Sequence, residues 1–353
     1  MKYIFFLSGD YIDLGKEEVL SLFYIKDFKL LNNLLIVDLK NNEKDIKKLS
    51  NRLALTKKIC KLLFECNIND LINSMEKFDW NSVYKNNFCL RINNNKKLKN
   101  HKQAEFLKKN LAKYIWRSLK NPKVNLEDPK TKIELFFAND KAYCGLMIFE
   151  NKEDFESRKA HLRPFPHPSS LHPRVARAVV NLSEIKENEI LLDPFCGTGG
   201  FLIEAGLMDI KTIGCDINKI MIKGCIENLK HYKIKKYKIE NQNALKINGK
   251  FDYVITDLPY GLNSNAIIRY DKNDWKKYRL NLKIQKKNFK KNLENFYLLF
   301  LKALRKKLRK KAVIIFPSYV NYKKLLKNSK FKIEKEFEQY IHRSLTRKIV
   351  KIR

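Results

Sequence analysis

The chain has 353 residues, of which 44% are hydrophobic and 12% aromatic, which excludes a globally disordered chain and allows two or three folded domains. Its formal net charge of +35 at pH 7 indicates a polyanionic partner such as nucleic acid, because lysine and arginine displace counterions from phosphates. Lysine, asparagine and isoleucine are abundant throughout, as an AT-rich genome would produce, so a merely solvated basic surface is the alternative.

The first 55 residues predict a small α/β unit. The apolar run at the start is short and soon meets Asp10 and Asp13, so it predicts a first strand and not a signal peptide. The expected elements are two strands and two helices, at Tyr3 to Leu7, Leu14 to Tyr24, Leu34 to Leu39 and Glu43 to Leu55.

Residues 56–155 predict a second module, of α+β type. Four short apolar strands surround one helix, at Ile59 to Phe64, Phe88 to Ile92, Ile133 to Phe137 and Tyr143 to Phe149, with the helix at Lys102 to Leu119. This helix presents Phe106, Ala112, Ile115 and Trp116.

Residues 156–172 concentrate prolines and cations without periodicity, which predicts an ordered linker. Pro173 suits a first helical turn, so the helix from Val175 to Leu182 opens a third domain, residues 173–353. Strands and helices then alternate, at 190–194, 199–208, 211–216, 219–230, 236–240, 251–257, 293–308 and 312–317, before two closing strands at 331–340 and 346–352.

This alternation predicts a parallel sheet with helices on both faces. Only residues 341–344 join the last two strands, which is too short for a helical crossover, so these strands should pair antiparallel. The predicted fold class is therefore α/β and Rossmann-like, with a seven-stranded, mostly parallel sheet that ends in an antiparallel hairpin.

The seven cysteines argue against disulfides and zinc. They are odd in number and contain no CxxC pair, so we expect small core residues in a reducing cytoplasm and no bound metal. No apolar run approaches the length of a membrane span. The predicted localisation is therefore cytoplasmic, without membrane contact.

A glycine-rich turn lies where the strand of Ile190 to Leu192 passes into a helix. Glycine there lets the backbone approach a ligand, and the free N–H groups of a helix start can cradle its polar end. Such a loop alone also fits a NAD site. The residues predicted to bind a cofactor here are Asp193, Pro194, Phe195, Cys196, Gly197, Thr198 and Gly199.

Polar residues follow the next two strands of the same domain. Asp216, with its neighbour Ile217, lies about twenty residues after the glycine turn, where a carboxylate would hold ribose hydroxyls. Asn243 and Ala244 follow the next strand, where an adenine edge could be recognised. Together these strand ends favour S-adenosylmethionine over NAD.

A tetrapeptide after the strand of Phe251 to Ile255 supports this choice. Asp257-Leu258-Pro259-Tyr260 resembles the (Asn/Asp)-Pro-Pro-Tyr motif of amino-group methyltransferases, with Leu258 in place of the commonest proline. The resemblance implies that the Asp257 carboxylate and the Leu258 carbonyl accept the two hydrogens of a nucleobase amine, while Tyr260 stacks on the base and Pro259 stiffens the loop. The alternative is a strand-ending turn with a buried tyrosine.

Cys196 offers a different chemistry, since a cysteine nucleophile can form a covalent adduct with a ring carbon. Its place inside the glycine turn instead favours a small packing residue.

Residues 263–292 form a basic insertion directly after the tetrapeptide. Lysines and arginines alternate there with aromatic residues, which is typical of a segment that reaches a polyanion beside the cleft. A solvated insertion with a few packing aromatics is the alternative.

The resemblance extends to archaeal tRNA guanine-N2 methyltransferases, which are class I methyltransferases. It rests on Arg163-Pro164-Phe165, on the segment from His167 to Ala178 and on the ending His342-Arg343-Ser344-Leu345-Thr346-Arg347. It implies a ferredoxin-like domain at 1–55, a THUMP RNA-binding domain at 56–155, a linker at 156–172 and a methyltransferase domain at 173–353.

The family also implies further site residues and partners. Linker residues Ser169, Leu171 and His172 would help to close the cofactor pocket. His342 and Arg343 lie in the hairpin connection beside the sheet, where they are expected to bind a tRNA phosphate or line the base pocket. A solvated turn is the alternative for the last two. The implied cofactor is S-adenosylmethionine and the implied partner is tRNA, bound by a monomer.

The expected activity is formation of N2-methylguanosine and then N2,N2-dimethylguanosine at position 10 of tRNA. Alternatives are a methyltransferase for another target, such as guanosine 6 of tRNA, ribosomal RNA guanine or DNA adenine, and a non-catalytic RNA-binding protein. The acids Asp193, Asp216 and Asp257 argue against the non-catalytic alternative.

Overall fold

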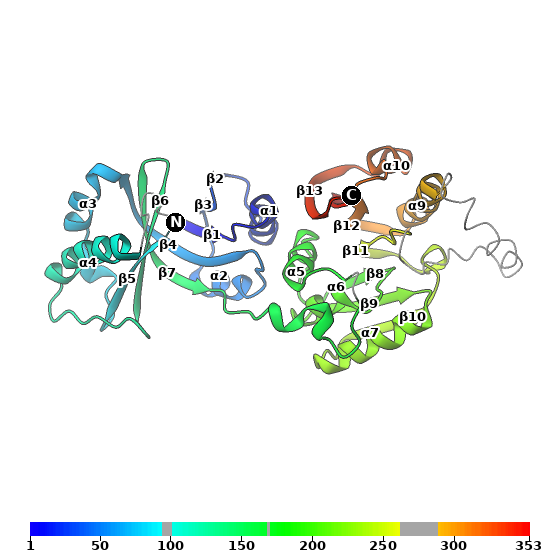
Figure 1. The fold of residues 1–353 in the computed structure, drawn as a ribbon, viewed down its shortest axis with the longest axis horizontal. Coiled ribbons are helices and arrows are strands. Elements are labelled where there is room, and N and C mark those ends of the chain that lie inside the picture. The colour runs from blue at the N-terminus through cyan, green and yellow to red at the C-terminus, as the bar shows by residue number, and fades with distance from the viewer. Residues whose placement is uncertain (94–100, 168–169, 262–288) are drawn as a thin grey trace, which may run out of the picture. The chain divides into compact units, whose positions relative to one another are not determined.

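The computed structural model describes residues 1–93, 101–167, 170–261 and 289–353. The chain divides into two compact units, Met1–Glu153 and Asp154–Arg353 (Figure 1). Each unit is built on its own seven-stranded sheet.

The sheet of the first unit has the strand order β2-β3-β1-β4-β7-β6-β5. All neighbours pair antiparallel except β5 and β6, which are parallel. The strands are β1 (Lys2–Leu7), β2 (Phe28–Leu31), β3 (Leu34–Asp38), β4 (Thr56–Asn67), β5 (Phe88–Asn93), β6 (Thr131–Ala138) and β7 (Lys141–Glu150). Strand β4 pairs with β1 on one side and β7 on the other, so one sheet runs through both segments that the sequence divides at residue 55.

Four helices of the first unit are α1 (Ile12–Phe23), α2 (Glu43–Ser50), α3 (Leu71–Lys77) and α4 (His101–Ser118). The expected extension of α2 to Leu55 is wrong. The buried carboxylate of Glu18 on α1 accepts hydrogen bonds of 2.9 Å from the backbone N–H groups of Ala54 and Leu55, which fixes those residues outside a helix.

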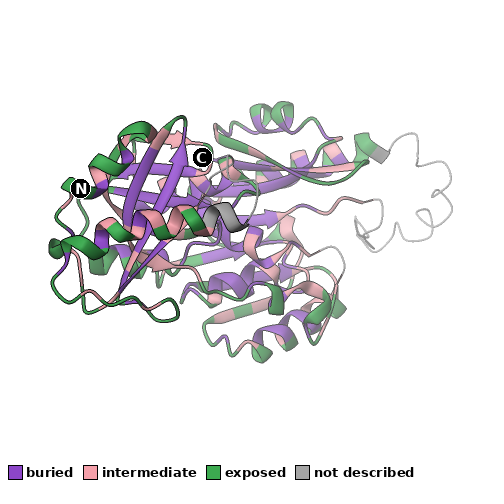
Figure 2. Cartoon of the chain, turned by 60° about the vertical axis from the view of Figure 1, so that its left-hand side comes forward, coloured by how far each residue is buried: buried purple, intermediate pink, exposed green. Residues whose placement is uncertain are grey.

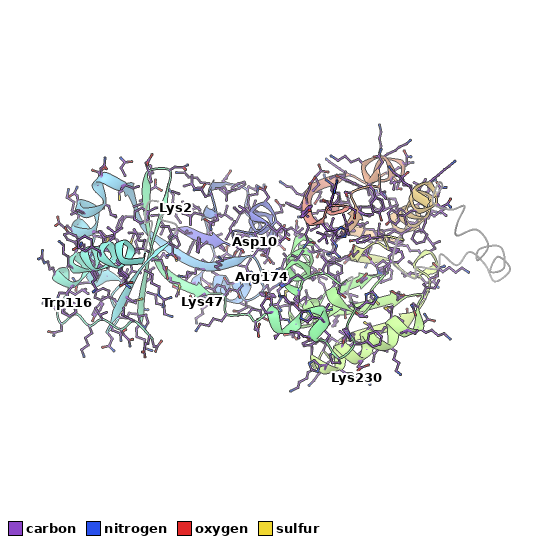
Figure 3. All side chains as sticks on the ribbon, viewed as in Figure 1. Lys2, Asp10, Lys47, Trp116, Arg174 and Lys230 are labelled. Atoms are coloured by element: carbon purple, nitrogen blue, oxygen red, sulfur yellow. The ribbon has the colours of Figure 1, made fainter. Side chains whose placement is uncertain are left out.

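Not all of the apolar residues that the sequence predicts on one face of helix α4 are buried. Ile115 is buried against α3 and the sheet, whereas Phe106 is 72% exposed and Trp116 48% exposed. Figure 3 shows Trp116 on the outer side of α4. Leu111 completes the buried face of this amphipathic helix, and the two aromatic side chains lie on its solvent side.

The sheet of the second unit has the order β10-β9-β8-β11-β12-β14-β13. The five strands β10, β9, β8, β11 and β12 run parallel to one another. Strand β14 is antiparallel to β12, and β13 pairs antiparallel with β14. The strands are β8 (Ile190–Asp193), β9 (Lys211–Asp216), β10 (Tyr237–Asn241), β11 (Phe251–Asp257), β12 (Leu308–Pro317), β13 (Ile333–His342) and β14 (Leu345–Ile352). The predicted parallel sheet with an antiparallel closing hairpin is confirmed.

Helices cover both faces of this sheet, and its inner strands β8, β11, β12 and β14 are largely buried (Figure 2). On one face α5 (Pro173–Leu182) contacts α6 (Gly200–Gly206), which contacts α7 (Lys219–His231). On the other, α9 (Phe289–Arg305) contacts the 3-10 turn η5 (Ala244–Lys246) and α10 (Tyr322–Asn328). In a sheet covered by helices on both faces, ligands bind at the carboxyl ends of the parallel strands.

The segment 156–172 belongs to the second unit and is ordered over its described residues. Arg158, in the 3-10 turn η3 (Glu156–Arg158), donates from Nε to Oε1 of Glu204 on α6 at 2.9 Å. The backbone N–H of Phe165 donates to Oδ1 of Asn228 on α7 at 2.9 Å. These contacts fix the segment across α6 and α7.

All seven cysteines are free thiols, and six of them are buried, as expected for small core residues. Within the described ranges, no helix combines the length and apolar character needed to cross a lipid bilayer.

Candidate active site

The glycine turn between β8 and α6 adopts two left-handed backbone conformations, at Gly197 (φ +51°) and Gly199 (φ +87°). Only glycine takes these conformations without strain. A Cβ on Gly199 would lie 2.8 Å from Sγ of Cys225, so packing also excludes a side chain there. Among the described residues, a Cβ on Gly197 would meet no atom within 4 Å, so the backbone at Gly197 leaves room for a ligand.

Asp193, at the end of β8, is buried and 1% exposed. Its Oδ1 accepts hydrogen bonds from the Thr256 hydroxyl at 2.9 Å and from the backbone N–H of Phe195 at 3.1 Å. Burial raises the pKa of Asp193 to about 7, and the nearby carboxylates of Asp216 and Asp257 add to this effect. These contacts shape the turn from inside the fold; its direct contact with a cofactor stays a prediction.

Asp216, at the end of β9, joins the glycine turn to the neighbouring strand. Its Oδ2 accepts from the backbone N–H of Gly197 at 3.0 Å, and its Oδ1 accepts from that of Asn218 at 2.8 Å. Burial raises its pKa. The adjacent Ile217 is 39% exposed, so an acid and an apolar side chain lie together beside the open backbone of Gly197.

Asn243 follows β10 and caps η5, because its Oδ1 accepts from the backbone N–H of Leu245 at 2.9 Å. Asn241 pairs with Asp216 in the parallel register of β10 and β9. The structure therefore brings the predicted residues around Asp193, Asp216 and Asn243 to the same edge of the sheet.

The end of the segment 156–172 reaches the glycine turn through Ser170, whose hydroxyl lies 3.3 Å from that of Thr198. Leu171 is buried, and His172 caps α5 by accepting the backbone N–H of Arg174 at Nδ1, 3.2 Å away. Burial lowers the pKa of His172. Ser169 lies outside the described residues.

The remaining residues of the glycine turn pack inward. Phe195, which follows Pro194, makes edge contacts with Phe296 and Phe300 of α9, with ring centroids 5.9 and 5.0 Å apart. Cys196 is 5% exposed, and the neighbouring Cys225 thiol together with burial raises its pKa well above the usual value. A buried, protonated thiol is a poor nucleophile, so the covalent alternative is not supported.

Two tyrosine hydroxyls donate hydrogen bonds to backbone carbonyls of the loop from Asp257 to Tyr260. Tyr297 on α9 donates to the carbonyl of Pro259 at 2.7 Å, and Tyr319 donates to the carbonyl of Tyr260 at 2.6 Å. Neither hydroxyl takes the carbonyl of Leu258. The Leu258 side chain is 1% exposed and packs in the core against α9, which explains why leucine serves at this position.

Asp257 and Tyr260 form a hydrogen-bonded pair with Arg347 of β14. The Tyr260 hydroxyl donates to Asp257 Oδ1 at 2.5 Å and accepts from Arg347 Nε at 2.8 Å, and Arg347 Nη2 lies 3.6 Å from Asp257 Oδ2. Burial raises the pKa of Asp257 to about 6, opposed by Arg347 and by the Tyr260 hydrogen bond. Burial and the adjacent carboxylate also raise the pKa of Tyr260 well above 10.

His342 and Arg343 lie exposed at the turn between β13 and β14. His342 pairs with Leu345, which lies two residues before Arg347, so strand alternation places His342 on the Arg347 face of the hairpin. Their role in RNA binding stays a prediction. The basic insertion expected at 263–292 lies outside the described residues except for its last four, which begin α9.

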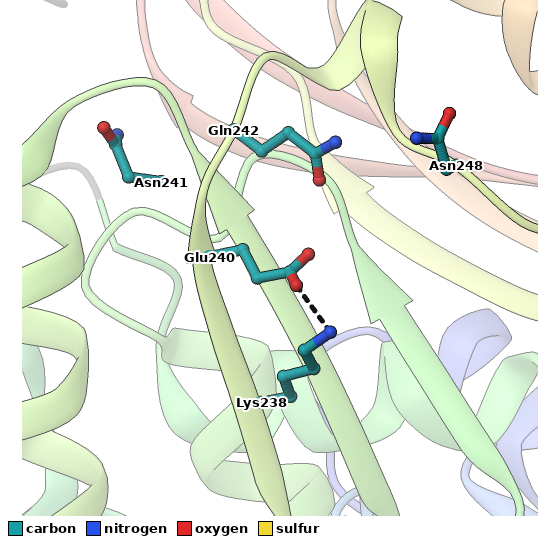
Figure 4. A pocket seen from close by; sticks show the side chains of 5 residues that line it. All are labelled: Lys238, Glu240, Asn241, Gln242 and Asn248. Carbon is teal, nitrogen blue, oxygen red and sulfur yellow. Dashed lines mark ion pairs between the residues drawn. The ribbon is translucent and has the colours of Figure 1, made fainter.

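A polar groove of about 610 Å³ opens at the free edge of the sheet (Figure 4). Its side chains include an ion pair of 2.6 Å between Lys238 and Glu240. The groove is lined by Lys238, Glu240, Asn241, Gln242 and Asn248, and none of the predicted site residues is among them. Asn241 nevertheless donates to the carbonyl of Asp216 at 2.9 Å, so the groove adjoins the site without forming it.

The sequence patterns do not single out two residues that contact the site, Arg347 and Asn228. Arg347 was noted only within the closing motif, and Asn228 not at all, although its Nδ2 donates to the carbonyls of Thr198 and Phe165 at 3.0 and 3.1 Å. A polar residue at a buried position of an element is the signal that marks both. In the described ranges, no three His, Cys, Asp or Glu side chains gather as a metal site.

Comparison with known proteins agrees with this geometry. Residues 160–291 match the model of RMKL-like methyltransferase domains, and residues 65–146 match that of THUMP domains. The fold resembles TrmN from Thermus thermophilus (TM-score 0.54, 14% identity, covering 100% of this chain and 99% of that one). It also resembles SMU.472 in complex with SAH (TM-score 0.52, 15% identity, 99% and 97% covered). The chain is therefore a class I methyltransferase that carries a THUMP domain.

Relatives in sequence narrow the class. The chain is 32% identical to the tRNA (guanine(10)-N2)-dimethyltransferase of Methanothermobacter thermautotrophicus over 85% of this chain and 83% of that protein. It is 33% identical to the enzyme of the same name from Pyrococcus abyssi over 79% and 78%. A tRNA (guanine(6)-N2)-methyltransferase of Methanocaldococcus jannaschii is 35% identical over only 36% of this chain. The chain belongs to the family of archaeal tRNA (guanine(10)-N2)-dimethyltransferases.

Proposed function

We propose that this protein transfers methyl groups from S-adenosylmethionine to N2 of guanosine 10 in tRNA, forming N2-methylguanosine and then N2,N2-dimethylguanosine. The observation that carries the proposal is the Asp257 carboxylate, which is only 18% exposed and lies at the same sheet edge as the open backbone of Gly197. Family membership over most of the chain supplies the target.

The residues at the strand ends suit the cofactor. Gly197 leaves room for a ligand against its backbone, and the Asp216 carboxylate stands where ribose hydroxyls would be held, beside the exposed apolar side chain of Ile217. Asn243 lies at the next strand end, where it would recognise an adenine edge. When bound, S-adenosylmethionine supplies an electrophilic methyl group on a sulfonium centre.

Asp257 has two tasks toward the guanine amine. The lone pair of this amine is delocalised into the ring, so hydrogen bonds to Asp257 and to the Leu258 carbonyl orient it for attack. Methyl transfer makes the nitrogen cationic, and a carboxylate whose pKa is about 6 is ionised at neutral pH and can accept the released proton. The base has to leave its stack to reach this position.

Tyr260 changes partner in this scheme. Its hydroxyl occupies Oδ1 of Asp257 in the structure, so the incoming amine has to displace it. The freed ring is then available to stack on the base, as the resemblance to amino-group methyltransferases implies.

The target is tested with nucleoside mass spectrometry of unmodified tRNA transcripts incubated with the protein and S-adenosylmethionine. We expect N2-methylguanosine first and N2,N2-dimethylguanosine later, and neither in a transcript with adenosine at position 10. Product that persists after this replacement but disappears when guanosine 6 is replaced would establish the position-6 alternative. Sedimentation of the purified protein, alone and with tRNA, tests the expected monomer.

A further inference from the structure

Arg347 brings a buried positive charge to the Asp257 loop from a distant part of the chain. It lies on β14, opposite Gln339 on β13 and opposite Pro317 at the end of β12. The side chain is 8% exposed, which is unusual for arginine unless the charge has partners. Its guanidinium therefore reaches the loop at the end of β11 from a strand on the far side of β12, and not from solvent.

The side chain contacts both members of the proposed catalytic pair. Nε donates to the Tyr260 hydroxyl at 2.8 Å, Nη2 lies 3.6 Å from Asp257 Oδ2, and the guanidinium carbon lies 5.8 Å from the centre of the Tyr260 ring. Behind it, Nη1 donates to Gln339 Oε1 at 3.4 Å, and Gln339 is itself 4% exposed. Four separate contacts thus fix one guanidinium between the loop and β13.

We propose that Arg347 is a positioning residue for methyl transfer, which orients the Asp257 carboxylate throughout and holds the Tyr260 hydroxyl against it until the amine displaces that hydroxyl. This inference rests on the proposed function. Because Arg347 donates to the Tyr260 oxygen, the hydroxyl hydrogen is directed to Asp257 Oδ1. The same guanidinium remains beside Oδ2 when an amine replaces that hydroxyl.

The charges around Asp257 are of opposing sign. Asp193 on β8 faces it as a second buried carboxyl, and Tyr297 on α9 and Tyr260 face it as neutral phenols. Arg347 is the cation of this group and opposes the rise that burial imposes on the pKa of Asp257. Removing its charge raises that pKa further, so the carboxylate becomes protonated over a range of pH where the wild-type group is ionised.

The test compares Arg347→Gln with Arg347→Lys, using methyl transfer to whichever tRNA nucleoside the wild-type protein modifies. In R347Q we expect kcat at pH 7 to fall at least about ten-fold and the acidic limb of the kcat profile to move up by about one pH unit, with partial recovery at pH 9. R347K keeps the charge but not the Nε contact, so its limb stays near that of wild type while kcat falls a few-fold.

Two further measurements exclude a merely structural or RNA-binding role. The Kd of R347Q for S-adenosylmethionine and for tRNA should stay within about two-fold of wild type. Gln339→Ala, which loosens the guanidinium but keeps its charge, should lower kcat without moving the limb, and it provides a second variant if R347Q does not fold.

Three results would overturn the assignment: an R347Q profile parallel to that of wild type, an unchanged kcat at pH 7, or a loss confined to the Kd for tRNA. Failure of the proposed function is distinguishable, because then the wild-type protein itself would methylate no tRNA guanosine at N2.

Discussion

The hydroxyl of Thr256 donates a hydrogen bond of 2.9 Å to Oδ1 of Asp193, and both side chains are buried. The bond joins the ends of β8 and β11, the strands that carry the glycine turn and the Asp257 loop. A buried hydrogen bond therefore connects the two parts of the proposed site, the glycine turn and the Asp257 loop.

Thr256→Val should lower the free energy of unfolding by about 1–3 kcal/mol, because valine matches threonine in shape but leaves a buried acceptor without this donor. Urea denaturation at pH 7 measures the change. Thr212→Val is the matched control, since the hydroxyl of Thr212 is buried on β9 and finds no hydrogen-bond partner among the residues that the structure describes. Equal losses in the two variants would show that the bond to Asp193 has no special weight.

Asp193 should make stability fall as pH rises from about 4 to about 7. Its pKa is raised to about 7 in the folded state, so the folded chain binds a proton that the unfolded chain has released, and the stabilisation this gives is lost through that range. Asp193→Asn removes the titration. The difference in Tm between wild type and D193N should therefore change across this range and level off near pH 8. A difference that is constant from pH 4 to pH 8 would contradict the raised pKa.

Asp257→Ala should reduce methyl transfer at least about 100-fold, because it removes both the acceptor that orients the amine and the proton acceptor. Asp252→Ala is the control on the same strand; Asp252 makes surface ion pairs with Arg309 and Lys310. D252A should keep near-normal turnover. Single-turnover transfer from radiolabelled cofactor and anisotropy with labelled tRNA separate chemistry from binding. Turnover of D257A near that of wild type would refute the proposed mechanism.

Gly197→Ala and Gly199→Ala should fail for different reasons. Each imposes roughly 1–2 kcal/mol of backbone strain. In G197A the methyl group enters open space, so the protein should stay folded but bind S-adenosylmethionine at least about ten-fold more weakly, as isothermal titration would measure. In G199A the new atom meets Cys225, so the Tm should fall further.

Adding Cys225→Ala to G199A tests the second reason, because it removes the sulfur that the new methyl group would meet. The double variant should lose less Tm than the two single changes sum to. Strict additivity would mean that the clash is absorbed elsewhere.

Periodicity in the sequence was sufficient for most of the architecture. Alternating strands and helices predicted the parallel sheet, and the short connection before Leu345 predicted the antiparallel hairpin, because both follow from local hydrophobic pattern and chain length. The strand β2 and the helices α3 and α10 were missed, since each has at most seven residues and little room for a period to register.

The site was predictable where backbone conformation or strand ends define it, as at Gly197 and Asp216. Arg347 was not, because its role depends on the register of β14 against β12 and β13, which no local pattern encodes. The hydrogen bond from Tyr260 to Asp257 could not be predicted either, because it depends on the conformation of the tyrosine side chain. The same tetrapeptide is compatible with a tyrosine that stacks on a base and with one that binds the carboxylate.

The pairing of strand β4 limits where the first unit can be cut into fragments. Its 12 residues hold β1 on one edge and β7 on the other, so a fragment that begins at residue 56 would expose a bare row of backbone donors and acceptors. Such an edge invites aggregation. Removal of the first 55 residues should therefore destabilise the segment that follows them, and the practical place to cut the chain is after Glu153.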